Sequence, residues 1–214
     1  MKITTTVQKL DDVLKGGIEE GSNVLIISDM LIDKSRFGLD ILSGALPKID
    51  SGLYFVNNKF PDFVKGSIKN WGRAKKKISL IDGFSYTAGR DSREEFQIKV
   101  KVTDIKSYTN VIRNVVSDAF HKKSREKTLF LFDSLDYWIG SWKLMEDMIK
   151  EIRKNAAVHY YLIADVGLNA KETNRLQRMF DYVIFLRIMK GKSTIIKEIS
   201  VLKPATKMKI QITD

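Results

Sequence analysis

Hydrophobic positions along the chain form short runs that alternate with segments of helical period. Runs of strand length, rich in β-branched and aromatic residues, lie at 23–28, 52–57, 77–82, 128–133, 158–164 and 181–188. Apolar residues three and four positions apart predict helices near 34–46, 61–72, 107–122 and 139–155. An alternation of strands and helices is typical of βαβ units. The pattern therefore predicts an α/β fold with a mostly parallel central sheet flanked by helices.

Two later runs, 193–202 and 207–213, differ because apolar and polar residues alternate in them, with lysines such as Lys197 and Lys209 at polar positions. This alternation is typical of strands with one face in water, and it predicts a C-terminal antiparallel hairpin. The segment 83–106 shows no clear period and is predicted to be a functional or partly disordered insert. No Pro/Gly-rich linker divides the chain, so residues 1–214 are predicted to form a single domain.

The composition excludes several kinds of site. Cysteine is absent, which rules out disulfides, thiolate metal ligands and a cysteine nucleophile. Only His121 and His159 are present, so a site built from many histidines is excluded as well. No apolar run reaches the roughly 20 residues of a membrane span, and the first residues lack the apolar core of a signal peptide. We therefore expect a cytoplasmic protein without a membrane span.

The net charge of +11 allows two interpretations. A basic surface attracts nucleic acid, anionic membranes or acidic proteins. The alternative is a lysine-rich surface that is simply solvated. No nucleic-acid motif and no basic stripe interleaved with aromatic residues accompanies the charge, so binding to nucleic acid has no support from a motif.

The segment from Ser28 to Ser35 is the candidate nucleotide-binding loop. Lys34 and Ser35 follow a predicted strand and begin a predicted helix, which is the register of a P-loop, G-x-x-x-x-G-K-[ST]. Ser28 and Asp33 stand where the two glycines would be. Glycines let backbone N–H groups curve around phosphates without a side chain in the way. The candidate cofactor-binding residues are Ser28, Asp29, Met30, Leu31, Ile32, Asp33, Lys34 and Ser35.

A second candidate position is Asp133, which ends the apolar run 128–133. In P-loop enzymes an acidic residue at such a strand end and a hydroxyl after the P-loop lysine hold Mg²⁺. Asp133 and Ser35 are therefore the candidate magnesium ligands. The alternative is a turn or helix-cap aspartate, because Asp favours such positions in any fold.

Residues 10–26 carry a resemblance to a known family. Leu10 and Asp11 begin a segment, L-D-x-x-L-x-G-G-I-x-x-G, that resembles the opening of the KaiC/RadA branch of the RecA-superfamily P-loop ATPases. Later strands resemble it too, at 52–58, 81–85, 132–134 and 201–204, so the likeness spans about residues 7–213. It is similar to the archaeal KaiC-like group, which includes the archaellum regulatory ATPase. The resemblance implies a RecA-like fold, bound ATP and Mg²⁺, and homo-oligomers with nucleotide between subunits.

The chain departs from that family in three places. Asp33, and Asp29 with it, would bring negative charge toward the phosphates of a degenerate Walker A loop. Asn57 and Asn58 stand where the family has glutamates, and an amide cannot accept a proton from water. No arginine follows Lys203 in the motif that the family uses in trans. We expect Lys34 to pair with Asp33 or Asp133 when no phosphate is bound.

Three functions remain open. The first is a regulatory or scaffolding KaiC-like protein with a protein partner and weak or absent ATP hydrolysis, which needs no cofactor. The second is an active ring ATPase with a divergent P-loop, and the third is a nucleic-acid-binding recombinase paralogue. Trp138 and Trp142 lie four residues apart and are expected to pack inside, the alternative being an exposed patch for a partner.

Overall fold

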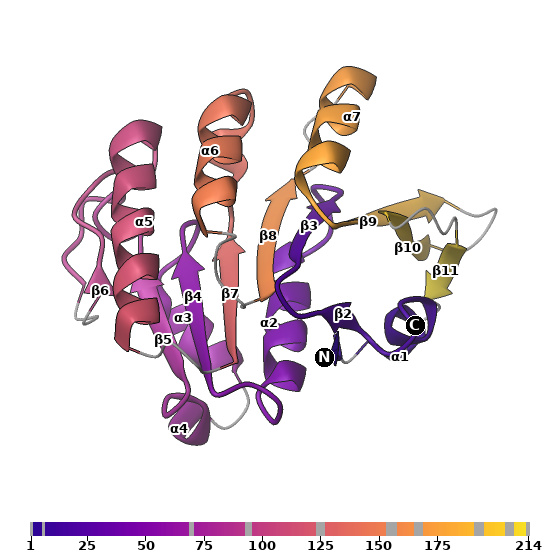
Figure 1. Cartoon of the computed structure of the whole chain (residues 1–214), viewed down its shortest axis with the longest axis horizontal. Coiled ribbons are helices and arrows are strands. Elements are labelled where there is room, and N and C mark those ends of the chain that lie inside the picture. The colour runs from indigo at the N-terminus through magenta and orange to yellow at the C-terminus, as the bar shows by residue number, and fades with distance from the viewer. Residues whose placement is uncertain are drawn as a thin grey trace.

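The computed structural model describes residues 2–5, 7–68, 71–92, 96–122, 127–152, 158–164, 169–190, 195–203 and 208–212. Nine strands in this part of the chain form one sheet in the order β11-β10-β9-β3-β8-β7-β4-β5-β6 (Figure 1). The strands are β3 (Asn23–Ser28), β4 (Ser51–Val56), β5 (Ile78–Asp82), β6 (Phe96–Gln97), β7 (Thr128–Asp133), β8 (Val158–Ala164), β9 (Tyr182–Lys190), β10 (Ile195–Lys203) and β11 (Met208–Ile212). Neighbours from β9 to β6 are parallel, whereas β9, β10 and β11 pair antiparallel.

Helices cover both faces of the sheet, which explains why its central strands are continuously apolar. On one face lie α2 (Lys34–Ala45), α3 (Pro61–Ser67) and α4 (Trp71–Ala74). On the other lie α5 (Ile105–Lys122), α6 (Trp142–Ile152) and α7 (Ala170–Met179) (Figure 1). Alternate residues of β4 pack on opposite faces of the sheet. Tyr54 lies in the hydrophobic core under α2, and Phe55 lies in the core under α5, α6 and α7. Strand β4 therefore separates two hydrophobic cores.

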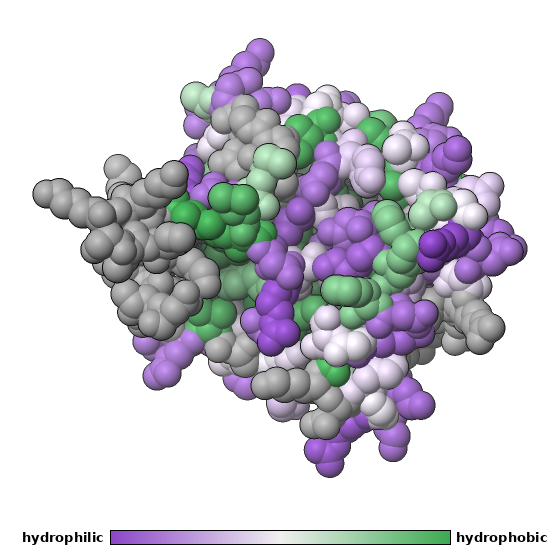
Figure 2. Space-filling model, turned by 180° about the vertical axis from the view of Figure 1, so that it is seen from behind, coloured by the Kyte–Doolittle hydropathy of each residue, from purple (hydrophilic) through white to green (hydrophobic). Residues whose placement is uncertain are grey.

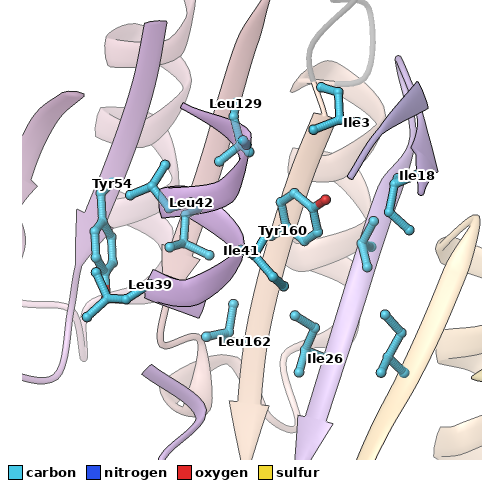
Figure 3. Packing of buried hydrophobic residues seen from close by; sticks show 14 of the residues in the cluster. Ile3, Ile18, Ile26, Leu39, Ile41, Leu42, Tyr54, Leu129, Tyr160 and Leu162 are labelled. Atoms are coloured by element: carbon cyan, nitrogen blue, oxygen red, sulfur yellow. The ribbon is translucent and has the colours of Figure 1, made fainter. Parts of the chain in front are cut away.

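Helix α2 approaches the sheet closely. Figure 3 shows its residues Leu39, Ile41 and Leu42 packed over side chains of the central strands, among them Tyr160 and Leu162. Gly38 makes this approach possible, because a Cβ there would lie 2.9 Å from a methyl carbon of Leu162. The position of α2 matters for function because its first turn carries Lys34 and Ser35.

An N-terminal unit precedes the sheet and was not predicted as separate elements. It consists of β1 (Lys2–Ile3), α1 (Gln8–Val13) and β2 (Ile18–Glu19), and β1 pairs antiparallel with β2. Gly16 and Gly17 turn the chain between α1 and β2 with φ of 102° and 117°. A side chain at Gly17 would also collide with the Ile3 backbone, so both features require glycine.

The predicted α/β fold class is confirmed, with a mostly parallel sheet and an antiparallel pair of C-terminal strands. The described part of 83–106 is more ordered than predicted, because it contains β6 and begins α5. Its residues Ile98 and Val102 are buried in the core. The predicted helix 61–72 is interrupted between α3 and α4. Lys207 and the side chains of Lys197, Lys203 and Lys209 lie outside the described part of the structure.

The back of the molecule is shown in Figure 2. Its centre is hydrophilic, and an apolar area lies toward the side of β9.

No helix among the described residues is long and apolar enough to cross a membrane.

Candidate functional site

The candidate residues meet at the carboxyl edge of the sheet, where β3, β7 and β4 end. The loop after β3 leads into α2, and Asp133 is the last residue of β7. Val56 pairs with Asp133, and the N–H of Asn57 donates to the Asp133 carbonyl at 2.7 Å. The fold therefore brings Ser35, Asn57, Asn58 and Asp133 together, although they are far apart in the sequence.

Asp133 is the centre of a buried hydrogen-bond network. Its Oδ1 accepts from Ser35 Oγ at 2.9 Å and from Asn58 Nδ2 at 3.1 Å. Its Oδ2 accepts from the hydroxyl of Tyr54 at 2.5 Å. Burial raises the pKa of Asp133, while hydrogen bonds from Tyr54 and Ser35 act in the opposite direction. Three donors, on α2, on β4 and in the loop after β4, therefore hold a carboxylate that is fully buried.

Tyr54 is the member of this network that the sequence did not reveal. It lies in β4, is fully buried, and faces α2. Burial and then the Asp133 charge raise its pKa well above the ordinary value, so the phenol stays protonated and donates. A tyrosine inside an apolar strand was a signal that its hydroxyl needs a partner, because buried hydroxyls are hydrogen-bonded. The identity of that partner depended on strand order.

Asn57 and Asn58 are held by the protein. Asn57 Nδ2 donates to the Ser134 carbonyl at 3.2 Å, and its Oδ1 accepts from the hydroxyl of Tyr108. Asn58 donates to Asp133, as described above, which a glutamate could not do when ionised. A carboxylate at 58 would instead repel Asp133. The amide at this position is therefore matched to the buried carboxylate beside it.

Lys34 pairs with a residue that was not predicted. Its Nζ lies 3.0 Å from Oδ2 of Asp136, which begins the short 3₁₀ helix η1 (Asp136–Trp138) after β7. The expectation that Lys34 pairs with Asp33 or Asp133 is wrong. Asp133 already accepts from three donors, and the carboxylate of Asp33 is turned toward its own helix. The lysine reaches the next carboxylate beyond the strand.

Asp33 is the N-cap of α2. Its Oδ1 accepts from the N–H of Arg36 at 3.0 Å. A carboxylate at this position satisfies a helix N–H that has no partner within the helix, and it interacts favourably with the positive end of the helix dipole. The same N-terminus is where a P-loop holds phosphate. Asp33 therefore places the chain's own anion at that end of α2.

Asp29 turns away from α2, contrary to expectation. Its Oδ2 accepts from the Ile188 N–H at 2.6 Å, and its own N–H donates to Leu186 at 2.9 Å. These bonds continue the pairing between β3 and β9 beyond the end of β3. Asp29 is thus fixed to the neighbouring strand and brings no charge toward Lys34.

Several backbone N–H groups of the loop are used within the protein. The N–H groups of Asp29, Ile32 and Lys34 donate to backbone carbonyls of the protein, at 2.8–2.9 Å. No residue from 28 to 35 has the positive φ that P-loop glycines supply. Ser35 and Asp133 have the oxygen chemistry for Mg²⁺. No group of three or more His, Cys, Asp or Glu side chains suited to a metal is found among the described residues.

Large apolar side chains are exposed around the same edge. Met30 and Leu31, in the loop after β3, are 77% and 86% exposed. Phe63 on α3, Tyr86 after β5 and Tyr137 after β7 are exposed as well. Trp138 and Trp142, by contrast, are buried in the second core, which confirms packing and excludes the alternative of an exposed tryptophan patch.

Comparison with solved structures decides the fold. The chain superposes on a KaiC-like protein from the hyperthermophilic archaeon Pyrococcus horikoshii with a TM-score of 0.74 and 12% sequence identity. The likeness covers 100% of this chain and 94% of that one. The chain has a KaiC-like fold.

Curated relatives match only part of the chain. A UPF0273 protein of Pyrobaculum aerophilum is 27% identical over 123 residues, which is 55% of this chain and 44% of the relative. A UPF0273 protein of Pyrococcus furiosus is 25% identical over 128 residues, 57% of this chain and 52% of the relative. The chain therefore spans about half the length of these relatives. No protein-family model matches it.

Proposed function

We propose that this KaiC-like protein acts as a regulatory or scaffolding component that binds a protein partner, with weak or no ATP hydrolysis. The observation that carries the proposal is the internal pairing of the residues at the nucleotide position. Asp33 caps α2, and Lys34 is bound to Asp136. The helix N-terminus and the lysine that would contact phosphate are therefore each bound to another part of the same chain.

Electrostatics also disfavour a nucleotide at this loop. A phosphate at the N-terminus of α2 would compete with the carboxylate of Asp33, and it would have to displace Asp136 from Lys34. Two unit anions about 4 Å apart repel by roughly 4 kcal/mol at an effective dielectric constant of 20. That energy corresponds to several hundredfold in affinity.

Hydrolysis would further lack a base. Asn57 and Asn58 offer amides that are already hydrogen-bonded to Ser134, Tyr108 and Asp133. An amide can orient a water molecule but cannot remove its proton. Weak binding, if it occurred, would therefore not lead to efficient turnover.

The exposed apolar residues at the carboxyl edge support a protein partner. Met30, Leu31 and Phe63 are each more than two-thirds exposed. Apolar side chains exposed along one edge of the sheet can form an interaction surface. The partner is either a different protein or a second copy of this chain, and sedimentation of the purified chain distinguishes the two.

Isothermal titration with Mg-ATP, followed by an assay of phosphate release, tests the proposal. We expect no binding in the low-micromolar range and no turnover above the rate of a Lys34→Ala variant. Tight binding accompanied by turnover that depends on Lys34 would overturn it. The variant Lys65→Ala, at a surface ion pair with Asp62, serves as a control for nonspecific effects of removing a lysine.

An active ATPase with a divergent P-loop is the second candidate. It is favoured by one observation, the 2.9 Å contact between Ser35 Oγ and Asp133 Oδ1. These two side chains lie together as a magnesium site requires, and Lys34 begins the adjacent helix. If this candidate holds, Lys34→Ala abolishes a measurable ATPase rate, whereas Lys65→Ala leaves it intact.

A further inference from the structure

A second concave surface lies between α6 and α7. The two helices stand side by side on the face of the sheet that is covered by α5, α6 and α7 (Figure 1). The groove between them encloses about 1100 Å³. None of the residues at 28–35 lines it. It is therefore a separate feature of the fold.

The base of the groove is apolar. Trp142, Ile149 and Met179 line it and are themselves 6%, 2% and 9% exposed, so they present only small parts of their surfaces. Trp142 is fixed by a hydrogen bond from its Nε1 to Oε1 of Glu172 at 3.2 Å. This bond ties the start of α6 to the start of α7, and the apolar base between the helices is thereby held in place.

The rim of the groove is basic. Lys150, Lys171, Arg175 and Arg178 line it, against the carboxylates of Glu146 and Glu172. Both carboxylates are already engaged within the protein. Glu146 contacts Lys150 at 2.7 Å and Arg175 at 3.5 Å. Glu172 belongs to the capping box of α7 with Asn169 and accepts from Trp142.

Two of the four cations are left without a partner. Lys171 and Arg178 make no ion pair or hydrogen bond through their side chains with any residue that the structure describes, and both are exposed. An apolar base flanked by unpaired cations is complementary to a ligand with one apolar face and carboxylates beside it. Charge complementarity therefore specifies the chemistry of the occupant.

The walls of the groove favour a helix as the occupant. Its volume of about 1100 Å³ is close to the upper limit of roughly 1,000 Å³ for ordinary ligand pockets. Helices α6 and α7 have 11 and 10 residues, which gives walls about 15 Å long at about 1.5 Å per residue. A guest helix of about ten residues matches that length. The walls are helices with no free sheet edge, so an extended peptide would find no backbone partners, whereas a helix satisfies its own.

We propose that the groove between α6 and α7 docks an acidic amphipathic helix of a protein partner. The apolar side chains of this helix contact Trp142, Ile149 and Met179, and the carboxylates of the helix pair with Lys171 and Arg178. A second copy of this chain is a poor occupant. Among the described α-helices, only α1 and α6 carry more carboxylates than cations, and α1 has six residues while α6 already forms a wall of the groove. The inference rests on the proposed protein-binding role but not on the state of the loop after β3.

Binding of a designed peptide tests the proposal. The probe is a fluorescently labelled helix with leucine at positions i, i+3, i+4 and i+7 and glutamate elsewhere, and its binding to the full chain is followed by fluorescence anisotropy. We expect saturable binding that weakens as salt rises toward about 0.5 M. The double variant Lys171→Glu/Arg178→Glu should weaken it at least tenfold. The matched control Lys75→Glu/Lys76→Glu makes the same change in net charge at exposed positions after α4 and should bind like the unaltered chain.

The other outcomes each overturn the proposal. Equal weakening by both double variants would mean general attraction to a basic chain. Equal binding of a leucine–lysine peptide would mean that charge plays no part, and an absence of binding would mean that the groove does not take such a helix. Self-association that Lys171→Glu/Arg178→Glu abolishes would assign the groove to a second copy. None of these outcomes changes the result of the Mg-ATP titration, so failure here is distinct from failure of the proposed function.

Discussion

The polar centre around Asp133 and the groove between α6 and α7 differ in where the partners of their charged side chains lie. Asp133 is buried and accepts from Ser35, Tyr54 and Asn58. Lys171 and Arg178 are exposed, with no side-chain partner in the described part of the chain. Hydrogen bonds within the fold contribute to stability, whereas an unpaired surface charge is available to another molecule. Changes in the two regions should therefore affect different measurements.

Removal of the Asp133 carboxylate gives the largest expected effect. Asp133→Ala leaves the donors on Tyr54, Ser35 and Asn58 without their acceptor in a buried site, and each such donor costs about 1–3 kcal/mol. We expect the free energy of unfolding to fall by about 3 kcal/mol or more, as measured by urea denaturation. Asp62→Ala, at a side chain that is 94% exposed, should change it by less than about 0.5 kcal/mol. A similar small change in both variants would mean that the Asp133 network is not a source of stability.

The charge of Asp133 should also make stability depend on pH. Burial raises its pKa in the folded chain above the unfolded value of about 3.9. A group with a raised pKa contributes stability that is fully present below the unfolded pKa and is lost as pH rises through the folded one. Asp133→Asn removes that titration. We expect the stability of this variant relative to the unaltered chain to increase as pH rises from about 4, and a difference that is constant with pH would contradict the assignment.

Asp33 gives an intermediate effect and connects stability to binding. Asp33→Ala removes the cap of α2 and should cost about 1 kcal/mol, whereas Asp33→Gly should cost only a few tenths. Both changes remove the carboxylate at the helix N-terminus, so both should increase affinity for Mg-ATP by about tenfold or more. Asn169→Ala removes the cap of α7 in the same way. It should cost similar stability without changing nucleotide affinity, which separates loss of a cap from loss of a charge.

Strands were predictable here because burial on both faces leaves a continuous apolar run. The strands predicted at 23–28, 128–133 and 158–164 coincide with β3, β7 and β8. Helix α7 was missed because Leu176 and Met179 are its only buried residues, too few for a visible period. The partner of Lys34 was mispredicted for a different reason. That pairing depends on Tyr54, which donates to Asp133 from a neighbouring strand, and on η1, which places Asp136 near Lys34. Strand order cannot be predicted from the local sequence.

The smallest expected effect on stability comes from the cations at the rim of the groove. Lys171→Glu/Arg178→Glu should change the free energy of unfolding by no more than about 0.5 kcal/mol, because neither side chain has a partner to lose. The capping box of Asn169 and Glu172 is untouched, so α7 keeps its N-terminal structure. A loss of more than about 1 kcal/mol in urea denaturation would mean that these cations stabilise the fold. If stability is unchanged while binding of the acidic peptide is lost, the cations at the rim contribute to binding alone. The hydrogen bonds of the buried Asp133 contribute to folding instead.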